Sequence, residues 1–514
     1  MKESRLNLLN EISELRKMGY RFINKELSAI EFNREAGILG VRAEKNKDTF
    51  ILMFRIPSGV MSIDEMKWIL KCAEADNMEQ IHFTTRQSIQ FHGLSIDSVC
   101  DLMEQGIEHD IYTGGGGYFP KNIVVSPLSG IEKGEAFDVT QYALAVNEYF
   151  KEKIIGHNFP GKLKISFSNG DNDSANCTGT DLGFLAVNKN GEMAFKVYIG
   201  GRLGLNPKEG LCLEELCNPK EILYYIEALS RLFESEGRNF TKKKIRIKHI
   251  IERMEEEEFK ECFNKHLGEV KEEAELSINI KNIEYLKEGE KTNIQDSRLV
   301  EQKQEGLYSV YFHPVGGHAY VNDLKEILYV IEQMEDVELR LTPTGGIYIR
   351  NLKGKEAECV LKATEGSGGE TRLTQSISCM GSPICQMGIG ASQVMLKEIL
   401  EYFKGKNYFK DILPRIHISG CGNSCALQQG ALMGLTGKKK KINDVYKDGF
   451  ELYINGAFGE ENTKMTKVYG VLLVDVIPQF MYELALNIEA RGICFEEYIR
   501  EFDDEIIKLI EKFN

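Results

Sequence analysis

The chain has 514 residues, 42% of them hydrophobic, and a formal net charge of -14 at pH 7. A chain of this length can bury a core spread over several domains, and none of its apolar runs is long enough to cross a membrane. The N-terminus lacks the apolar segment of a signal peptide, and twelve cysteines do not form a disulfide scaffold in so long a chain. We therefore expect a cytoplasmic protein that binds neither membranes nor nucleic acid.

The first part of the chain contains one patterned segment. Residues 1–45 are predicted to form a polar, helix-prone N-terminal extension, and residues 46–112 a first half-domain. Apolar and polar residues alternate from Ile81 to Leu94, which predicts a strand with one buried face. Arg86 would start this strand, and His92 lies near its end. Taken alone, Arg86 is better explained as a solvated surface charge.

Lysines are the candidate functional residues of the next predicted domain, residues 113–295. In Pro160-Gly-Lys-Leu-Lys-Ile-Ser-Phe167, alternation places Lys162 and Lys164 on the same side of a strand. Two like charges on one face indicate a bound anion, although lysines also protect edge strands from pairing. Lys121 is either a further cation of this kind or an ordinary loop lysine.

The end of the same domain is rich in charge. Lys244, Arg246 and Lys248 alternate with apolar residues, which is typical of a strand with one basic face. Such a face either binds an anionic ligand, lies in solvent or docks an acidic partner. The charged stretch that follows, up to residue 295, is predicted to be a connector rather than a binding site.

Residues 296–366 repeat the first half-domain. Phe54-Arg-Ile-Pro-Ser-Gly59 is echoed by Phe312-His-Pro-Val-Gly-Gly317, and a helix-like stretch and a strand follow each motif in the same order. Arg86, however, corresponds to Thr344 in the second copy. We infer a gene duplication in which the second copy has kept the scaffold and lost this charge.

The last predicted domain, residues 367–514, contains two cysteine pairs with the spacings C-x5-C and C-x3-C. Thiolates select iron–sulfur clusters or zinc, and structural zinc sites usually have pairs separated by two to four residues. The wider first pair therefore favours an iron–sulfur cluster, with structural zinc or unrelated buried thiols as alternatives. The four candidate ligands are Cys379, Cys385, Cys421 and Cys425.

Taken together, these motifs resemble those of the sirohaem-containing sulfite and nitrite reductases, over nearly the whole chain. The resemblance implies an α+β fold with duplicated ferredoxin-like half-domains and two sirohaem/iron–sulfur α/β domains. It also implies that the four cysteines bind a [4Fe–4S] cluster and that Cys425 bridges this cluster to the sirohaem iron.

The resemblance assigns roles to the remaining candidates. The catalytic residues that bind the substrate anion and supply protons would be Arg86, Lys121, Lys162 and Lys164. The residues that contact the sirohaem would be Arg86, His92, Lys244, Arg246, Lys248, Asn423 and Cys425. Lys121 stands where the family has Arg, and a lysine cannot form the bidentate fork of an arginine to an oxyanion.

The implied reaction is a six-electron reduction. Sulfite to sulfide is favoured, because sulfite reductases of the family have Lys at the position of Lys164 and plant-type nitrite reductases have Asn. Nitrite to ammonia at the same site is one alternative, and a non-enzymatic tetrapyrrole-binding or zinc-stapled structural protein is another. No flavin or nicotinamide domain is recognisable, so we expect ferredoxin or a similar external electron donor. Lys438–Lys441 is the predicted docking patch, with a solvated turn as the alternative.

Overall fold

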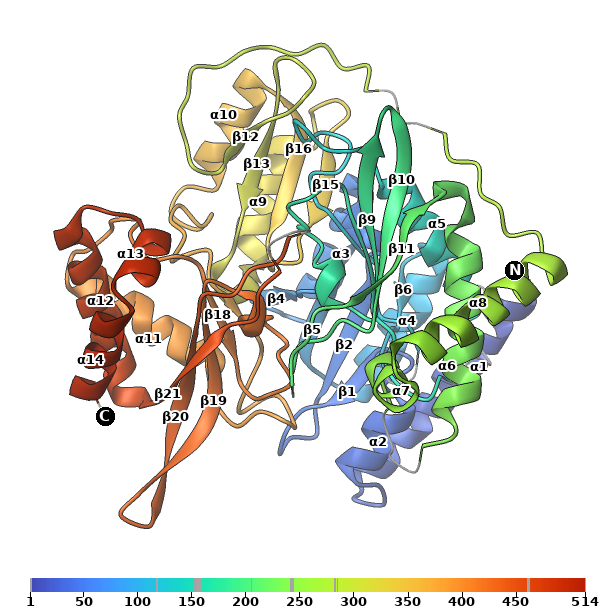
Figure 1. Cartoon of the computed structure of the whole chain (residues 1–514), viewed down its shortest axis with the longest axis horizontal. Helices are drawn as coiled ribbons and strands as arrows, with labels where there is room; N and C mark the ends of the chain where they lie inside the picture. The colour runs from blue at the N-terminus through green and yellow to red at the C-terminus, as the bar shows by residue number, and fades with distance from the viewer. Residues whose placement is uncertain are drawn as a thin grey trace.

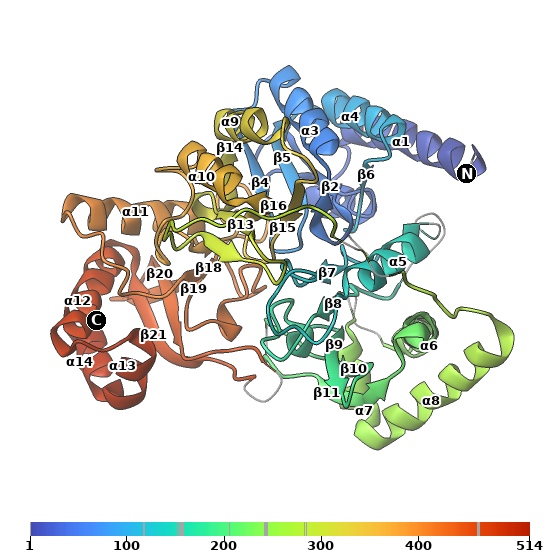
Figure 2. The same ribbon diagram turned by 90° about the horizontal axis from the view of Figure 1, so that it is seen from above.

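The computed structural model describes residues 2–116, 119–151, 153, 159–204, 206–240, 245–281, 283, 285–459 and 463–513. Within these residues the chain forms four β-sheets with helices packed around them (Figure 1). In Figure 2 the blue first half-domain and the yellow second half-domain lie together, with the teal-to-green and the orange-to-red parts as two separate lobes. The predicted α+β fold class is confirmed.

The first two sheets come from the predicted half-domains, and their strands follow the same order. The first contains, in order, β1 (Val41–Ala43), β2 (Phe50–Arg55), β5 (Ile89–Leu94), β4 (Gln80–Phe83) and β14 (His318–Tyr320), with β6 (Tyr112–Thr113) paired to β2. The second contains β12 (Leu299–Glu301), β13 (Leu307–Phe312), β16 (Ile347–Lys353), β15 (Glu338–Leu341) and β3 (Val60–Met61).

Each half-domain contributes a strand to the sheet of the other. The β14 strand of the second half pairs with β4, with His318 opposite His82. The β3 strand of the first half pairs with β15, with Val60 opposite Arg340. One hydrophobic core therefore runs through both sheets, from Ile12 to Leu361.

The third and fourth sheets also share a topology, so the duplication extends beyond the half-domains. Each has two parallel pairings followed by two antiparallel ones. The third sheet contains β7 (Val124–Val125), β8 (Ile165–Ser168), β9 (Leu182–Lys189), β10 (Glu192–Ile199) and β11 (Leu211–Cys217). The fourth contains β17 (Ile377–Ser378), β18 (Ile416–Ser419), β19 (Met433–Ile442), β20 (Val445–Ile454) and β21 (Lys467–Leu473).

Helices cover the outer faces of these sheets. In the first two sheets they are α3 (Ile63–Ala75), α4 (Ile96–Glu108), α9 (Val321–Ile331) and α10 (Gly354–Ala363). The third sheet is accompanied by α5 (Thr140–Lys151), α6 (Ile222–Gly237), α7 (Ile247–Met254) and α8 (Glu256–Glu273). The fourth has α11 (Ser392–Gly405), α12 (Ile477–Arg491), α13 (Phe495–Glu501) and α14 (Asp503–Phe513).

The N-terminal extension is only partly separate from the first sheet. It forms α1 (Lys2–Ile23) and α2 (Ala29–Glu35), and Arg16 of α1 pairs with carboxylates of α4. However, β1 also lies within residues 1–45 and forms the edge of the first sheet.

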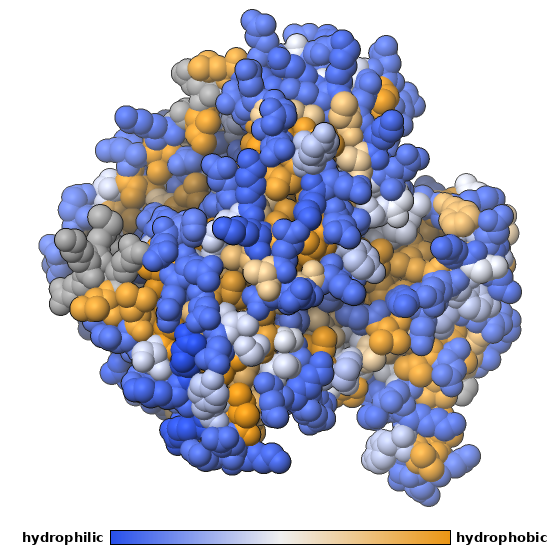
Figure 3. Space-filling view, turned by 180° about the vertical axis from the view of Figure 1, so that it is seen from behind, coloured by the Kyte–Doolittle hydropathy of each residue, from blue (hydrophilic) through white to orange (hydrophobic). Residues whose placement is uncertain are grey.

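None of the helices in the described ranges is long and apolar enough to cross a membrane. The face in Figure 3 is mostly hydrophilic, with hydrophobic residues in small scattered patches.

Candidate active site

Arg86 lies in a tight turn rather than at the start of a strand, so the prediction of one strand over 81–94 is wrong. β4 and β5 form a hairpin in which the Thr84 N–H donates to the carbonyl of Ser88 at 2.9 Å. The Thr84 hydroxyl accepts the N–H groups of Arg86 and Ser88, both at 3.2 Å. Gln87 has a φ of 52°, and this left-handed conformation interrupts an extended chain. Alternation alone did not reveal the turn.

The Arg86 guanidinium is buried, and one of its N–H groups has no partner. Its Nη2 donates to the carbonyls of Asn122 at 3.0 Å and Ile165 at 3.3 Å. The Asn122 amide in return donates to the carbonyls of Arg86 and Gln87. Arg86 Nε is buried without a hydrogen-bond partner. Burial lowers the pKa of Arg86 to about 10, so the group is a cation at neutral pH and can still donate to an anion.

Lys162 and Lys164 lie in the extended segment directly before β8, and not within the strand that was predicted to carry them. Leu163 between them is fully buried, whereas Lys162 is exposed and Lys164 is half-buried. This burial pattern agrees with the predicted alternation. The N–H of Lys164 donates to Asp181 Oδ2 at 2.8 Å, which fixes the backbone at this point.

The Lys164 ammonium lies in a strongly basic environment. Burial, together with the charges of Arg246 and Arg86, lowers its pKa to about 7. Asp181 and the Cys425 thiol act in the opposite direction. The structure therefore brings Lys164 close to both the Arg86 turn and one of the candidate cluster ligands. With a pKa near neutrality, Lys164 is suited to donating and regaining a proton.

Lys121 belongs to the same group of cations. Its N–H donates to the carbonyl of Leu163 at 2.9 Å, which ties its segment to that of the lysine pair. Burial lowers the pKa of Lys121 well below its usual value, and the charges of Arg42, Lys162, Lys164 and Arg86 add to this effect. The four predicted catalytic cations are thus brought together.

The basic segment around Arg246 is not a strand, which corrects the prediction. Arg246 directly precedes α7, and Lys248 lies within this helix, while Lys244 lies outside the described residues. The Ile and Met residues of Ile247–Met254 recur at helical spacing, which overrides the short alternation. Arg246 makes two bonds to the buried Asp181, at 2.9 and 2.7 Å. Burial lowers the pKa of Lys248 to about 8.

The four predicted cluster ligands lie on two neighbouring loops. Cys379 directly follows β17, and its sulfur accepts the N–H of Gly420 at 3.1 Å. Gly420 leads from β18 into the loop that carries Cys421 and Cys425. Cys385 closes the first loop, and its N–H donates to the carbonyl of Gly381 at 2.7 Å.

The thiols are close enough for their charges to interact. The pKa of Cys379 is raised by burial and then by Cys425, and that of Cys421 by burial and then by Cys425 and Cys385. Hydrogen bonds from Asn423 oppose the rise at Cys421. No group of three or more His, Cys, Asp or Glu among the described residues is arranged around a single metal ion. A cubane spreads its thiolates over four irons, so its ligands lie farther apart than those of one ion.

One face of the first sheet is polar and carries unpartnered ring nitrogens. Met53, Gln90, His82 and His318 lie side by side across four neighbouring strands. The buried nitrogens without a hydrogen-bond partner are Nδ1 of His82, Nδ1 and Nε2 of His92, and Nε2 of His318. Of these, His92 Nδ1 lies 3.7 Å from Glu44 Oε1. Burial lowers the pKa of His318 to about 4 and that of His82 well below its usual value, so both rings are neutral. Neutral imidazoles can donate hydrogen bonds to carboxylates.

Two arginines of the site were missed by the sequence analysis. Arg42 of β1 is exposed between the buried Val41 and Ala43, and its side chain makes no hydrogen bond or ion pair within the described ranges. Arg55 is buried and donates to the carbonyls of Pro120 at 2.9 Å and Lys121 at 3.4 Å, which positions the Lys121 segment. Arg55 lies in the motif Phe54–Gly59, and the corresponding residue of the second copy is His313, so the exchange of one polar residue for another inside this repeated motif could have drawn attention to Arg55.

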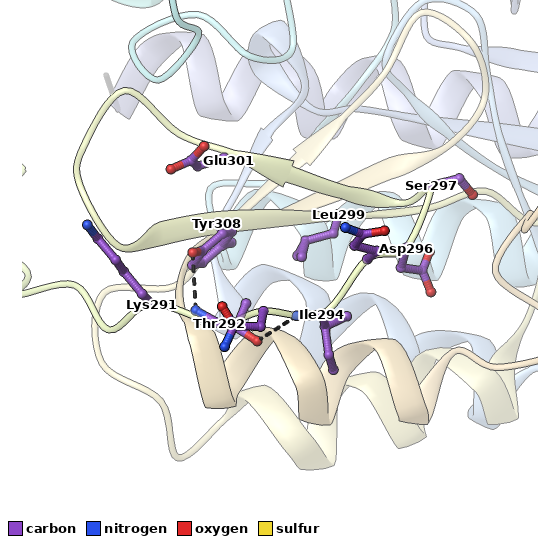
Figure 4. A pocket seen from close by; sticks show the side chains of 10 residues that line it. Lys291, Thr292, Ile294, Asp296, Ser297, Leu299, Glu301 and Tyr308 are labelled. Atoms are coloured by element: carbon purple, nitrogen blue, oxygen red, sulfur yellow. Dashed lines mark hydrogen bonds between the residues drawn. The ribbon is translucent and has the colours of Figure 1, made fainter.

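A surface hollow of about 690 Å³ is lined by residues of β12, of β13 and of the segment that precedes them (Figure 4). Lys291, Asp296, Glu301 and Tyr308 are among the residues that line it. Because it presents charges of both signs and none of the predicted site residues, we do not assign the reaction to it.

Comparison with known proteins agrees with the duplicated architecture. A sequence model described as "Nitrite/Sulfite reductase ferredoxin-like half domain" matches residues 42–108 and 300–366. A second, described as "Nitrite and sulphite reductase 4Fe-4S domain", matches residues 116–271. The matched residues together cover more than half of the chain. The second match falls on the first copy of the α/β domain, whereas the four cysteines lie in the other copy.

Individual relatives are similar over most of the chain. The ferredoxin–nitrite reductase of Synechococcus elongatus is 23% identical over 450 residues, which are 84% of this chain and 86% of the relative. Sulfite reductase [ferredoxin] 1 of Mycolicibacterium paratuberculosis is 22% identical, over 80% of this chain and 74% of the relative. The solved structure of the Mycobacterium tuberculosis NirA protein has a TM-score of 0.77 at 17% identity and covers 97% of both chains.

The residues of the site fit the two cofactors of this family, sirohaem and a [4Fe–4S] cluster. Sirohaem is rich in carboxylates, and the site offers a group of buried cations together with unpartnered N–H groups and imidazole nitrogens. The cluster requires four thiolates, and the two loops supply Cys379, Cys385, Cys421 and Cys425. The chain therefore belongs to the nitrite and sulfite reductase family, whose members are sirohaem- and [4Fe–4S]-dependent oxidoreductases.

Proposed function

We propose that this protein reduces sulfite to sulfide with six electrons from an external ferredoxin. The observation that carries the proposal is the position of Lys164, which lies within range of Arg86, Arg246 and Cys425. A second positive charge beside Arg86 favours the more highly charged sulfite ion over nitrite. Sulfite reduction consumes protons as each oxygen leaves as water, and a lysine with a pKa near 7 can supply them.

The proposed roles follow from the surroundings of each side chain. Arg86 donates its unpartnered Nε–H to the anion, and Lys121 and Lys162 add positive charge where negative charge gathers. Lys164 donates a proton and regains it from water. When bound, sirohaem would supply the iron that takes the anion, and the cluster would supply the electrons. His92, Arg246 and Lys248 are proposed to face the macrocycle, as is the undescribed Lys244.

Asn423 and Cys425 are proposed to lie where the cluster meets the macrocycle. Cys425 is the proposed bridge, because its thiol interacts with Lys164 on one side and with Cys379 and Cys421 on the other. We propose a cytoplasmic location, because none of the twelve cysteines is paired in a disulfide bond.

Nitrite reduction to ammonia is the second candidate. The ferredoxin–nitrite reductases of Synechococcus elongatus and several plants are similar to this chain over at least four-fifths of its length. Nitrite is smaller and carries one charge fewer, so it would need fewer of the cations.

The test is direct turnover with both anions. Purified protein with its cofactors would be supplied with reduced methyl viologen, and sulfide and ammonium would be measured as products. We expect a higher kcat/KM for sulfite. A higher value for nitrite would select the second candidate, and turnover of neither anion in a coloured, fully loaded protein would overturn both.

A further inference from the structure

A hydroxyl group connects the anion-binding turn to the cluster-binding loop. Thr85 precedes Arg86 in the β4–β5 turn, and its Oγ1 donates to the carbonyl oxygen of Cys425 at 2.8 Å. The two residues are 340 positions apart in the sequence and belong to different sheets. The contact therefore joins the turn that carries Arg86 directly to the loop that carries the proposed bridging sulfur.

The same turn is attached on its other sides by further hydrogen bonds. The Asn122 amide donates to the carbonyls of Arg86 at 3.0 Å and Gln87 at 2.9 Å. The Gln87 amide donates to the carbonyls of Val125 at 3.0 Å and Leu341 at 2.7 Å. These bonds hold the turn on the first α/β domain and the second half-domain. The Thr85 hydroxyl adds a hydrogen bond from the turn to the loop that carries the cysteines.

The second copy of the turn shows that folding does not require this hydroxyl. In Thr342-Pro343-Thr344-Gly345, the Thr342 N–H donates to the carbonyl of Gly346 at 2.9 Å, as Thr84 does to Ser88. The Thr342 hydroxyl accepts the N–H of Gly346 at 3.0 Å. Pro343 stands in the place of Thr85 and has no donor at all.

The partner of the hydroxyl differs between the copies as well. Ser126 N donates to the carbonyl of Phe167, and Cys379 N donates to that of Ile418, so Ser126 and Cys379 occupy equivalent positions. Counting along the loops after β8 and β18, Ser174 stands in the place of Cys425. The donor is thus present where the loop has its cysteine and missing where the loop has serine.

We propose that Thr85 is a positioning residue that holds the Cys425 loop in register with the anion-binding turn of Arg86. The proposal rests on the proposed function, because it assigns Thr85 to the site where anion and cluster meet. Hydrogen bonds around a cluster also influence its reduction potential. A bond donated toward a ligand favours the reduced, more negatively charged state.

Three variants of the full, cofactor-loaded protein test this role. Thr85→Val keeps the shape and removes the donor, and Thr85→Ser keeps the donor. Thr463→Val is the matched control, because the Thr463 hydroxyl makes a 2.8 Å contact between the two α/β domains, with Thr178, and touches no cysteine. The measurements are the midpoint potential of the cluster, the electron paramagnetic resonance of the reduced protein, and kcat and KM with reduced viologen.

We expect Thr85→Val to lower kcat about fivefold, the worth of one hydrogen bond, while KM changes less than about twofold. The midpoint potential should become more negative, and the resonance spectrum should change. Thr85→Ser should restore all three properties, and Thr463→Val should leave them unchanged. An unchanged potential and spectrum in Thr85→Val would overturn the proposal, as would an equal loss in Thr85→Ser.

The spectroscopic measurements separate this proposal from the proposed function. A loaded protein that reduces neither anion would overturn the proposed function, yet a shifted potential in Thr85→Val would still support the link to the cluster. A protein that takes up no cluster would overturn both.

Discussion

The polar face of the first sheet and the equivalent face of the second differ in what fills them. In the first sheet, Met53, Gln90, His82 and His318 form a row, and the histidines keep unpartnered nitrogens. The matching row of the second sheet consists of Tyr311, Tyr348, Arg340 and Val60.

The second face is filled by the chain itself. The rings of Tyr311 and Tyr348 lie 4.6 Å apart, and the Tyr311 hydroxyl is 2.6 Å from that of Thr344. Arg350 donates to the carbonyls of Pro127 at 3.1 Å and Ser129 at 3.0 Å. The duplication thus produced two similar scaffolds whose polar faces carry different side chains: histidines in the first, and tyrosines and arginines in the second, where the Nε groups of Arg340 and Arg350 also have no hydrogen-bond partner.

The cysteine loops also differ between the two copies, but here the cysteines belong to the second copy and serines stand in their places in the first. In the fourth sheet, the Gly420 N–H donates to the Cys379 sulfur at 3.1 Å, and in the third the Asn169 N–H donates to the Ser126 hydroxyl at the same distance. The Ser126 and Ser174 hydroxyls are 2.6 Å apart in place of two thiols. The proposed active site therefore combines the histidine-bearing face of the first half-domain with the cysteine loops of the second α/β domain. The predictions below exchange single side chains between the copies or alter one copy alone.

The largest effect is expected from Cys425→Ser, which gives the ligand loop the residue of its counterpart. A hydroxyl is a poor ligand for an iron centre, so turnover should fall below about 1% of normal and the cluster resonance should be lost or altered. Cys494→Ser, at another exposed cysteine, is the control. Normal reduction of both anions by Cys425→Ser would refute the bridge.

Arg86→Thr introduces the residue of the second copy, Thr344. Loss of a charge-assisted contact of about 1.5–3 kcal/mol should raise KM for the anion on the order of tenfold to a hundredfold. Arg372→Thr removes a surface arginine that pairs with Asp411 and serves as the control. KM would be measured by steady-state kinetics. A KM of Arg86→Thr for the anion within twofold of normal would contradict the assignment of Arg86 to anion binding.

Lys164→Asn tests the choice of anion. If Lys164 selects sulfite, its loss should lower kcat/KM for sulfite by about 1.5–3 kcal/mol and spare nitrite. Competition between the two anions in one reaction mixture would measure this ratio directly. Equal losses would make Lys164 a general cation, and no loss would mean that Lys164 takes no part in binding either anion.

The same variant should change the pH dependence of stability in protein without cofactors. The folded pKa of Lys164 is lowered to about 7, so the unfolded chain binds the proton more tightly. This penalty on folding is complete below pH 7 and disappears as pH rises toward the usual lysine pKa of about 10.4. Lys164→Asn should therefore raise the free energy of unfolding at pH 6 more than at pH 9. Urea titrations at the two pH values would measure this difference, and an equal gain in the free energy of unfolding at pH 6 and pH 9 would contradict the prediction. Lys397→Asn, at an exposed lysine, is the control.

The smallest effect is expected at Lys438–Lys441. These lysines lie on β19 of a long hairpin, where Lys438, Lys439 and Lys441 pair with Glu451, Asp448 and Asp444. Neutralising all four should give a modest loss of ferredoxin-driven turnover that weakens with salt, because the Debye length is about 10 Å at 0.1 M. Viologen-driven turnover is the control. Unchanged ferredoxin kinetics across salt concentrations would place docking elsewhere.

The sequence was informative where chemistry depends on residue type and spacing. The cysteine pairs, Arg86 and the lysine pair stand out without structural knowledge, and the structure brings them together. Alternation misled at two places, since it runs unbroken through the Arg86 turn and also appears at the start of α7. Periodicity over so few residues cannot separate a hairpin or a short helix from a strand.

Other features depend on contacts between distant segments. Arg42 and Thr85 carry no recognisable motif, and their importance follows only from what lies beside them in the fold. The pairing of β3 with β15 and of β14 with β4 could not be predicted either, because such pairings are determined by tertiary packing.

The exchange of these two strands has a consequence for how the protein folds. Neither half-domain can complete its sheet until the other has been synthesised, because residues near 320 must pair with residues near 80. Contacts of such high sequence separation slow folding and leave strand edges exposed to misassociation in the meantime. The half-domains should consequently unfold together in one cooperative transition, and a chain cut between them should yield two fragments that gain structure only when mixed.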